Sequence, residues 1–446
     1  MEIFIPKEAE IVLTKLEKAG FEAFLVGGCV RDSLLGFRAR DWDLVTSAKP
    51  QQIKAVFEGY RIIETGIKYG TVTLLIGQQA LEITTYRVEA SYTDGRHPDE
   101  VEFVKSLQDD LKRRDFTINA LAYHPQTGLM DYFGGLADLK NKTIVAVGEP
   151  KARFEEDSLR IMRALRFAAV YGFNIDTKTI AAMLEHKDLL KRVAPERIRP
   201  ELEKLLCGAT VKKVLKDYYP ILGVIIPEIL PMVDFDQHNP HHHLNVWEHT
   251  LECLAQIKPQ AILRLAALLH DIGKPGCFSL DNQGVGHFYG HNRASADITK
   301  GILIRLKFDN KTTEKLFTLV RYHDSEILKE PKYVKRWLNR LGEENLRLLL
   351  ELKRADALGQ APQFRTAKLQ YLQQLENILA AIIREGQCFS LKHLAVNGND
   401  LLQLGIPQGK QIGIMLDQLL KAVINEEAEN DRDKLLQLAK KEKPCK

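Results

Sequence analysis

The spacing of apolar residues changes character about a third of the way along the chain. Before that point, short runs in which apolar and polar residues alternate predict strands, for example over 41–46, 71–76 and 80–86. From residue 151 onward, apolar residues recur at helical spacing to the end of the chain. The pattern therefore predicts an α+β fold, in which an N-terminal mixed sheet with helices is followed by an extended all-α region.

Composition narrows the class of protein without identifying it. The chain has 446 residues, of which 45% are hydrophobic, and its net charge of +4 permits a polyanionic partner without requiring one. The six cysteines form no CxxC pair, which argues against a zinc site built on cysteines. No apolar stretch is long enough to span a bilayer and the N-terminus does not resemble a signal peptide, so we expect a cytoplasmic protein with no membrane partner. The sequence does not predict the oligomeric state.

Two carboxylates at strand spacing, Asp41 and Asp43, are the first candidates for chemistry. Side chains alternate along a strand, so both carboxylates would share one face and repel each other unless a cation lies between them. Carboxylate oxygens favour Mg²⁺. Glu82, in the alternating strand over 80–86, is a candidate third ligand or, equally, a solvated strand residue. A pair of surface acidic residues is the alternative for Asp41 and Asp43.

A glycine turn precedes these carboxylates. An apolar strand ends at Gly27 and Gly28, where a helix is predicted to begin. Gly28 would let a phosphate approach the backbone, and Arg31 would donate to phosphate oxygens. Further along, Arg114 belongs to a basic cluster that places cations where a triphosphate could bind. Each feature alone is also compatible with an ordinary strand-to-helix turn or a charged helix start.

Five segments then follow one another in a recognisable order: GGCVRD (27–32), DWD (41–43), RRDFTINALA (113–122), DYFGGLADL (131–139) and EDSLRIMRALRFAA (156–169). Together they resemble the ordered motifs of the class II tRNA nucleotidyltransferases and their bacterial poly(A) polymerase relatives. The resemblance implies a nucleotidyltransferase head of the DNA polymerase β type at 1–148 and a neck at 149–230. It further implies an HD-like helical body at 231–360 and a helical tail at 361–446 that binds tRNA. Glycine turns over 397–413 could contact RNA phosphates or, equally, could simply separate neighbouring helices.

The same resemblance implies template-independent addition of CCA to the 3′ end of tRNA from CTP and ATP, with release of pyrophosphate. Two Mg²⁺ ions held by Asp41 and Asp43 would activate the attacking hydroxyl and neutralise the leaving group. An A-adding tRNA enzyme or a poly(A) polymerase is the nearest alternative, while the full-length loop over 87–101 disfavours an enzyme that adds only CC. An HD-domain phosphohydrolase with a decayed head is the alternative from another class.

Asp157 and Arg160, three residues apart in a helical pattern, are predicted to lie side by side. Cytosine and adenine both present an amino donor beside a ring-nitrogen acceptor, whereas guanine and uracil present the reverse. A carboxylate beside a guanidinium would therefore match C or A and leave unpaired polar groups against G or U. The resemblance assigns this selecting role to Asp157 and Arg160, and further nucleotide contacts to Arg163 and Arg166. A surface salt bridge between Asp157 and Arg160 is the alternative.

Four residues of the helical region follow the H…HD…D order of HD-domain proteins: His249, His270, Asp271 and Asp356. Imidazole and carboxylate ligands from separate helices can close a transition-metal site. His291 and His323 could extend it to two metals. The pattern predicts a candidate second metal site without establishing that it hydrolyses phosphoesters.

Overall fold

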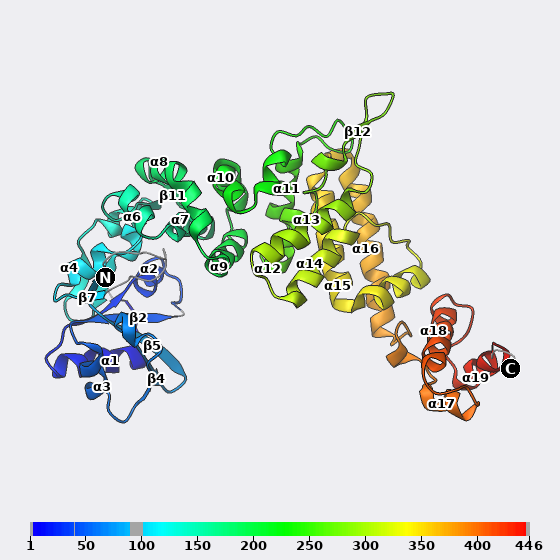
Figure 1. The fold of residues 1–446 in the computed structure, drawn as a ribbon, viewed down its shortest axis with the longest axis horizontal. Helices are drawn as coiled ribbons and strands as arrows, with labels where there is room; N and C mark the ends of the chain where they lie inside the picture. Colours follow the sequence, from blue (N-terminus) through cyan, green and yellow to red (C-terminus); the bar gives the residue numbers. More distant parts are fainter. Residues whose placement is uncertain (1–2, 40, 90–100, 443–446) are drawn as a thin grey trace. The chain divides into compact units, whose positions relative to one another are not determined.

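The structure is a computed structural model that describes residues 3–39, 41–89 and 101–442 (Figure 1). The chain divides into two compact units, Met1–Pro227 and Glu228–Lys446. The first unit contains a large sheet, and the described part of the second is helical apart from one short hairpin. None of the described helices is long and apolar enough to cross a membrane. The predicted α+β fold is confirmed, and the finer division into four domains stays a prediction.

The first unit is built on a seven-stranded mixed sheet. In the order in which they lie, its strands are β3 (Arg61–Ile63), β4 (Thr71–Ile76), β5 (Gln79–Thr85), β2 (Trp42–Thr46), β1 (Ala23–Val26), β8 (Leu121–His124) and β9 (Gly128–Asp131). β2 and β5 run parallel, and the other neighbouring pairs of this sheet are antiparallel. The strand predicted over 41–46 begins at Trp42, so Asp41 lies just before it.

The helices of the first unit are α1 (Lys7–Lys18), α2 (Gly28–Leu34), α3 (Pro50–Val56), α4 (Leu107–Lys112), α5 (Gly135–Lys140), α6 (Pro150–Glu156), α7 (Leu159–Tyr171), α8 (Thr177–His186), α9 (Pro195–Leu206) and α10 (Val211–Ile225). Asp157 lies between α6 and α7 in an extended conformation (φ −143°, ψ 99°). Its carboxylate accepts the backbone N–H of Leu159. The prediction that Asp157 and Arg160 are helical neighbours is therefore wrong, because extended backbone at Asp157 interrupts the helical spacing.

The centre of the sheet is buried on both faces. Leu25 and Leu44 pack into one core cluster, together with residues of α1 and α3. Val26 and Val45 pack into a second cluster with Tyr86 and residues of α4. Since neighbouring side chains of a strand point to opposite faces, burial on both faces explains why β1 (AFLV) reads as a continuous apolar run.

Shorter strands complete the first unit. β6 (Arg87–Glu89) pairs with β7 (Val101–Phe103), and β10 (Thr143–Ile144) pairs in parallel with β11 (Asn174–Ile175). The loop predicted between Glu89 and Glu100 falls almost wholly outside the described residues, so the expectation drawn from its length remains a prediction.

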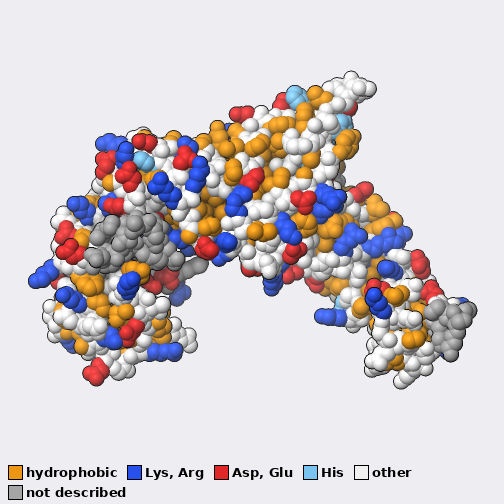
Figure 2. Space-filling model, in the orientation of Figure 1, with side chains coloured by type: hydrophobic (Ala, Val, Ile, Leu, Met, Phe, Trp, Pro, Cys, Tyr) orange, Lys and Arg blue, Asp and Glu red, His pale blue; other side chains and the backbone are white. Residues whose placement is uncertain are grey.

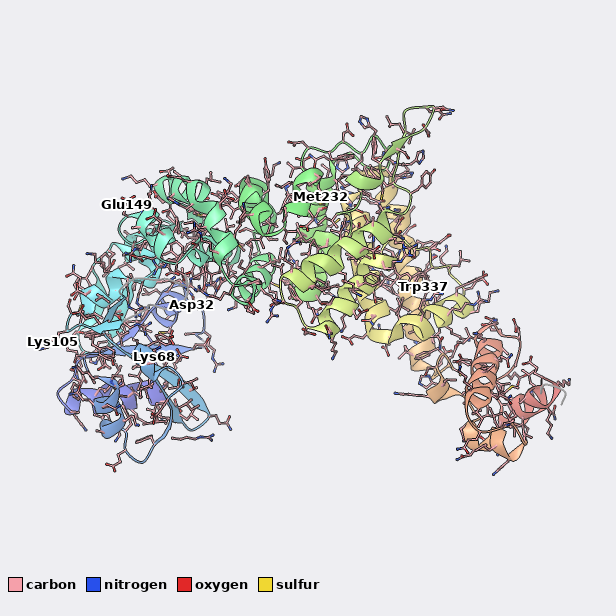
Figure 3. All side chains as sticks on the ribbon, in the orientation of Figure 1. Asp32, Lys68, Lys105, Glu149, Met232 and Trp337 are labelled. Atoms are coloured by element: carbon pink, nitrogen blue, oxygen red, sulfur yellow. The ribbon has the colours of Figure 1, made fainter. Side chains whose placement is uncertain are left out.

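The second unit consists of packed helices. They are α11 (Val246–Gln256), α12 (Ala261–Leu269), α13 (His291–Arg305), α14 (Asn310–Tyr322), α15 (Pro331–Gly359), α16 (Pro362–Arg384), α17 (Gly398–Gln403), α18 (Lys410–Ile424) and α19 (Arg432–Lys441), with a hairpin of β12 (Ser279–Leu280) and β13 (Gly286–His287). α15 packs against α11, α12, α14 and α16. Its Trp337, labelled in Figure 3, meets Tyr322 of α14 edge-on, with ring centroids 5.2 Å apart. This packing brings residues of α11, the end of α12 and α15 next to one another.

Candidate functional site

The two carboxylates predicted as metal ligands lie where β2 begins. Asp43 is the second residue of β2, Asp41 precedes the strand, and both line one cavity of about 730 Å³. Glu82 on the parallel strand β5 is the register partner of Asp43, so the two side chains emerge on the same side of the sheet. Burial and the neighbouring Glu82 raise the pKa of Asp43 to about 6; Arg114 opposes this rise and Asp41 adds to it. The three carboxylates therefore act on one another, although Glu82 does not line the cavity.

The glycine turn borders the same cavity. Gly27 has a φ of 74°, and a Cβ there would lie 2.8 Å from Nη1 of Arg114, so only glycine suits this position. α2 begins at Gly28, and Arg31 lies one turn along it. The Arg31 guanidinium stacks over the ring of Phe167, 4.9 Å from the centroid. The turn thus brings two arginines close to the backbone at the cavity wall.

Arg163 and Arg166 of α7 are held by buried carboxylates. Nε and Nη2 of Arg163 lie 2.7 Å and 2.6 Å from Oδ2 of Asp115. Nε of Arg166 lies 2.7 Å from Oε2 of Glu201 on α9. Burial by itself would raise the pKa of Asp115, but Arg163 and a hydrogen bond from Asn119 lower it to about 2. Asp115 is therefore an anion at neutral pH, and it fixes the orientation of Arg163.

Asp157 and Arg160 both line the cavity but do not pair with each other. Oδ2 of Asp157 accepts a hydrogen bond from Nη2 of Arg197 on α9 at 2.8 Å. Arg160 donates to Oε2 of Glu156 at 2.7 Å and to two backbone carbonyls. These two side chains therefore do not form the salt bridge that was the alternative prediction.

The residues predicted for the head and for the selecting part of the neck come together in one place. Besides Asp41 and Asp43, the cavity is lined by Gly28, Arg31, Arg114, Asp157, Arg160, Arg163 and Arg166. They come from α2, the start of β2, the segment after α4, and the α6–α7 region. The cavity has the size of a site for a nucleotide-sized ligand.

The sequence analysis missed several residues that shape this cavity. Arg87 and Arg113 also line it. Asn119 accepts a hydrogen bond from Arg31 and donates one to Oδ1 of Asp115 at 2.9 Å. Arg113, Asp115 and Asn119 all belong to the RRDFTINALA segment, so the motif could have identified them. Arg87, on β6, has no comparable local pattern around it.

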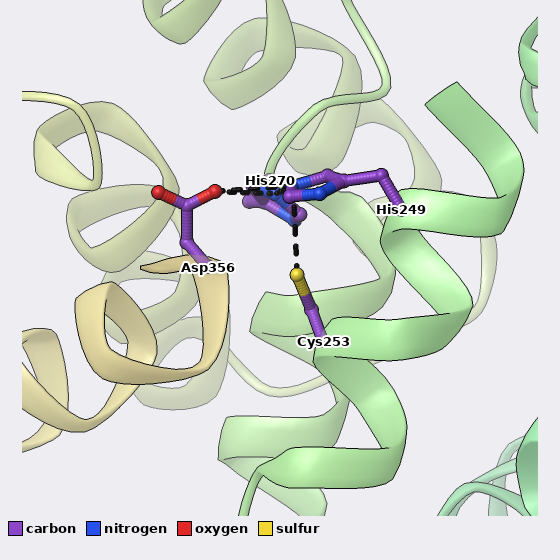
Figure 4. A group of neighbouring side chains, drawn as sticks. All are labelled: His249, Cys253, His270 and Asp356. Carbon is purple, nitrogen blue, oxygen red and sulfur yellow. Dashed lines mark hydrogen bonds and ion pairs between the residues drawn. The ribbon is translucent and has the colours of Figure 1, made fainter. Parts of the chain in front are cut away.

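The residues predicted for a second metal site also meet, where α11, the end of α12 and α15 come together (Figure 4). Nε2 of His249 lies 3.0 Å from Oδ1 of Asp356 and 3.4 Å from Nε2 of His270. Oδ2 of Asp271 lies 3.1 Å from Nε2 of His270 and 3.5 Å from Nε2 of His249. Cys253, which the sequence analysis did not include, joins them with its Sγ 3.5 Å from Nε2 of His249. We call these five residues the helical cluster.

His291 and His323 form a neighbouring pair. Their Nε2 atoms are 3.3 Å apart and lie 3.6 Å and 3.5 Å from Oδ1 of Asp271. Each Nδ1 donates to a backbone carbonyl, that of Phe288 for one ring and of Val320 for the other. In a neutral ring the proton on Nδ1 leaves a lone pair on Nε2. Two lone pairs then face each other with their nitrogens 3.3 Å apart, and they repel each other unless a cation lies between them.

Comparison with family models bears on both units. Residues 23–145 match the model described as "Poly A polymerase head domain", and residues 172–230 match "Probable RNA and SrmB-binding site of polymerase A". Residues 292–439 match a model for tRNA nucleotidyltransferase domain 2. With a carboxylate pair and an arginine-lined cavity on its mixed sheet, the chain is a nucleotidyltransferase.

Relatives over the full length narrow this class. The CCA-adding enzyme of Levilactobacillus brevis is 36% identical over 97% of this chain and 98% of its own length. A crystal structure of the Bacillus stearothermophilus CCA-adding enzyme in complex with CTP is 28% identical, covers 98% of both chains and has a TM-score of 0.73. The Thermotoga maritima CCA-adding enzyme complexed with tRNA, 20% identical, shares the fold with a TM-score of 0.61 over 98% of this chain and 96% of its own. The chain belongs to the family of CCA-adding enzymes.

Proposed function

We propose that the cavity of the first unit adds CCA to the 3′ end of tRNA, using CTP and ATP and releasing pyrophosphate. The observation that carries this proposal is the placement of Asp41 and Asp43 beside the Gly27–Gly28 turn in one arginine-lined cavity. The family membership and the CTP and tRNA complexes of related enzymes support the choice of substrates. A tRNA substrate also agrees with the cytoplasmic location expected from the sequence.

Asp41 and Asp43, with Glu82 as a third candidate, fit a site for two Mg²⁺ ions. They offer oxygen ligands only, and the partial exposure of this site leaves room for water and phosphate oxygens. Mg²⁺ bound there supplies Lewis-acid stabilisation of the phosphates and lowers the pKa of the attacking hydroxyl. The tRNA 3′-oxygen bonds to the α-phosphorus, its proton passes to water, and the bond to the β-phosphate oxygen breaks to release pyrophosphate. No side-chain nucleophile is required.

The arginines bind and orient the triphosphate in this proposal. Arg31 and Arg114 flank the glycine turn, while Arg163 and Arg166 follow at helical spacing on α7. A guanidinium can donate two parallel hydrogen bonds to phosphate oxygens. Because buried carboxylates already hold Arg163 and Arg166, their side chains lose little conformational freedom when a nucleotide binds.

Asp157 and Arg160 are proposed to select the base. The amino group of C or A donates to Asp157, and the adjacent ring nitrogen accepts from Arg160. Arg197 holds Asp157 and Glu156 holds Arg160, so both side chains stay at the cavity wall. A base with the opposite order of donor and acceptor would leave buried polar groups unpaired, which costs about 1–3 kcal/mol for each group.

The decisive experiment supplies three tRNA substrates that end before CCA, after C and after CC. CTP and ATP are given separately, and the products are sized. We expect CTP to extend the first two substrates and ATP to extend the third by one residue. If ATP extends a substrate and CTP extends none, the protein is an A-adding enzyme. Long A tails would identify a poly(A) polymerase. Either result would contradict the proposal.

The assignment of domains and their roles remains part of the proposal. The proposed domains are a head at 1–148, a nucleotide-selecting neck at 149–230, a body at 231–360 and a tRNA-binding tail at 361–446. Figure 2 shows Lys and Arg side chains interspersed with Asp and Glu on the drawn face of both units. No single basic patch marks a path for tRNA on that face, so the tail's role is supported by the family rather than by charge.

Metal-dependent hydrolysis of phosphate esters is a second candidate activity, favoured by the facing Nε2 atoms of His291 and His323. A cavity of about 380 Å³ is lined by both histidines, Asp271, Asp356 and Lys274. A transition metal held there would supply a bound hydroxide as nucleophile. Hydrolysis of a model phosphodiester that requires an added transition metal, and that disappears in His270→Ala, would support this activity; hydrolysis that survives the substitution would contradict it.

A further inference from the structure

Cys253 lies one helical turn after His249 on α11, and its thiol points toward the other side chains of the helical cluster (Figure 4). We infer that Cys253 is a thiolate ligand of a metal ion that His249, His270 and Asp356 also hold. A thiolate among imidazole and carboxylate ligands favours a thiophilic ion such as Zn²⁺, Co²⁺ or Fe²⁺ over Mg²⁺ or Mn²⁺. The inference rests on the proposal that the cluster binds a metal. A cobalt spectrum distinguishes metal binding as such from metal binding through sulfur.

The spacing of the four ligand atoms fits a tetrahedral ion. Metal–nitrogen distances of about 2.0–2.1 Å and a metal–sulfur distance of about 2.3 Å place two nitrogens about 3.4 Å apart, and nitrogen and sulfur about 3.6 Å apart. The Nε2 atoms of His249 and His270 are 3.4 Å apart, and Sγ of Cys253 is 3.5 Å from Nε2 of His249. Oδ1 of Asp356 lies 3.0 Å and 3.9 Å from the two nitrogens. All four atoms lie within 4.8 Å of one another.

A single hydrogen bond cannot serve all three neighbours of Nε2 of His249 at once. Nε2 of His249 faces Oδ1 of Asp356, Sγ of Cys253 and Nε2 of His270. One imidazole nitrogen has either a single N–H or a single lone pair. His270 also donates its Nδ1 proton to the carbonyl of Ala267 at 2.8 Å, so in the neutral ring its Nε2 offers a lone pair. A cation at the centre serves all four atoms at once.

Close packing holds the thiol in this position. Cys253 and His249 are both fully buried. A Cβ on Gly359 of α15 would lie 2.9 Å from Sγ of Cys253 and 2.7 Å from Nδ1 of His249. α15 therefore approaches α11 through bare backbone, and this approach fixes the ring and the thiol together. A buried cysteine can serve as a small apolar side chain, but here its Sγ contacts a ligand nitrogen.

A sulfur ligand would make the helical cluster chemically unlike the neighbouring pair of His291 and His323. Oδ2 of Asp271 faces the group that includes Cys253, while Oδ1 faces His291 and His323. The carboxylate thus lies between a position with a sulfur ligand and a position with nitrogen and oxygen ligands only. We expect the first position to retain its metal and the second to exchange it more readily.

Cobalt(II) reports directly on a sulfur ligand. The full-length protein is freed of metal with a chelator, dialysed and titrated with CoCl₂. We expect a sulfur-to-cobalt charge-transfer band in the near ultraviolet that Cys253→Ser removes, while the visible bands of cobalt bound to nitrogen and oxygen remain. Zn²⁺ affinity should fall by at least about tenfold in Cys253→Ser, and Mn²⁺ affinity should change by less than about twofold. Cys388→Ser, which changes another buried cysteine of the same unit, should retain the band.

X-ray absorption of the zinc-loaded wild-type protein needs no variant, and should show one sulfur at about 2.3 Å. Cobalt binding without the charge-transfer band, or zinc with only nitrogen and oxygen neighbours, would overturn the assignment of Cys253 and leave the metal site standing. If the wild-type protein binds neither metal, both the proposed metal site and this inference are wrong.

Discussion

The two units gather carboxylates in opposite surroundings. Asp41 is exposed and Asp43 is partly exposed beside an open cavity, and their ligand atoms are all oxygens. His249, Cys253 and His270 are fully buried and offer nitrogen and sulfur. A hard ion such as Mg²⁺ keeps several waters and is bound through few carboxylates plus substrate phosphates, whereas soft ligands retain a transition metal. If both proposed metal sites are correct, the comparison predicts a metal that arrives with the nucleotide in the first unit and a resident metal in the second.

The charges around the two sites differ as well. Arginines line the cavity of the first unit, which suits a polyphosphate. In the cavity beside the helical cluster, Nζ of Lys274 lies 2.7 Å from Oδ2 of Asp271 and 2.9 Å from Oε1 of Gln237. Much of its charge is therefore directed at protein groups. The first cavity suits a nucleoside triphosphate, and the second a smaller phosphate ester.

Removal of the head carboxylates should have the largest effect. Asp41→Asn and Asp43→Asn keep the side-chain shape and remove a charged ligand. We expect each to lower CTP incorporation into tRNA that lacks CCA by at least about a thousandfold, since metal catalysis contributes several kcal/mol. The metal content of the second unit, measured by mass spectrometry, should not change. Near-normal incorporation by the double variant in Mg²⁺ would contradict the assignment, and the exposed Asp188→Asn serves as a control.

The reverse substitution should separate the two sites. His270→Ala removes a buried ligand of the helical cluster, so we expect loss of bound transition metal and at least about a tenfold loss of any phosphoester hydrolysis. CTP and ATP incorporation should stay within about twofold of wild type, because none of the predicted nucleotide-binding residues belongs to the cluster. If incorporation is lost while the protein remains folded, the cluster serves nucleotide addition and the functional separation is wrong.

Base selection offers a finer test of the first unit. Asp157→Ala removes the acceptor for the amino group of C or A, and it also removes the partner of Arg197. We expect lower efficiency with CTP and ATP and measurable use of UTP or GTP, with discrimination reduced roughly ten- to a hundredfold. Incorporation of all four nucleotides into one tRNA measures the effect. Glu155→Ala, which removes an exposed carboxylate of α6, should leave the four ratios unchanged. Unchanged ratios for Asp157→Ala would place the selecting role elsewhere.

The fold was predictable where the signal is local. Alternation over 71–76 matches β4, and alternation over 80–86 matches β5 to within one residue at each end. The prediction fails at Asp157, where a side chain that accepts a nearby backbone N–H competes with the helix. Such competition is invisible to a spacing rule, because the rule counts positions and ignores what the side chain bonds to.

The candidate site, too, was predictable from the sequence only in part. Motif order gathers residues such as Arg163 and Asp157 correctly into one cavity. It does not reveal the partner of Arg163, because Asp115 lies 48 residues before it. The absence of a CxxC pair argued against a zinc site built on cysteines and gave no reason to single out Cys253, whose neighbours in the helical cluster come from separate helices. The four-residue spacing from His249 was its only local signal.

The smallest expected effect tests the buried ion pair that fixes one arginine of the head cavity. Although burial opposes it, Arg163 together with a hydrogen bond from Asn119 lowers the pKa of Asp115 from its ordinary value of 3.8 to about 2. A carboxylate whose pKa is lower in the folded state stabilises the protein above its unfolded pKa, and loses this contribution as the pH falls toward the folded pKa. We therefore expect Asp115→Asn to lower the free energy of unfolding of the first unit by roughly 2 kcal/mol at pH 7.

The difference between wild type and Asp115→Asn should shrink as the pH falls from about 4 to about 2, because the wild-type carboxylate then takes up a proton as well. Urea unfolding, followed by amide hydrogen exchange in α7, measures this difference within the first unit. The exposed Asp188→Asn should leave the profile unchanged. A loss of stability in Asp115→Asn that is the same at pH 7 and pH 2 would show that shape or hydrogen bonding at Asp115 matters rather than its charge. In that case the contact with Arg163 would not be the electrostatic anchor that holds this arginine in the nucleotide cavity.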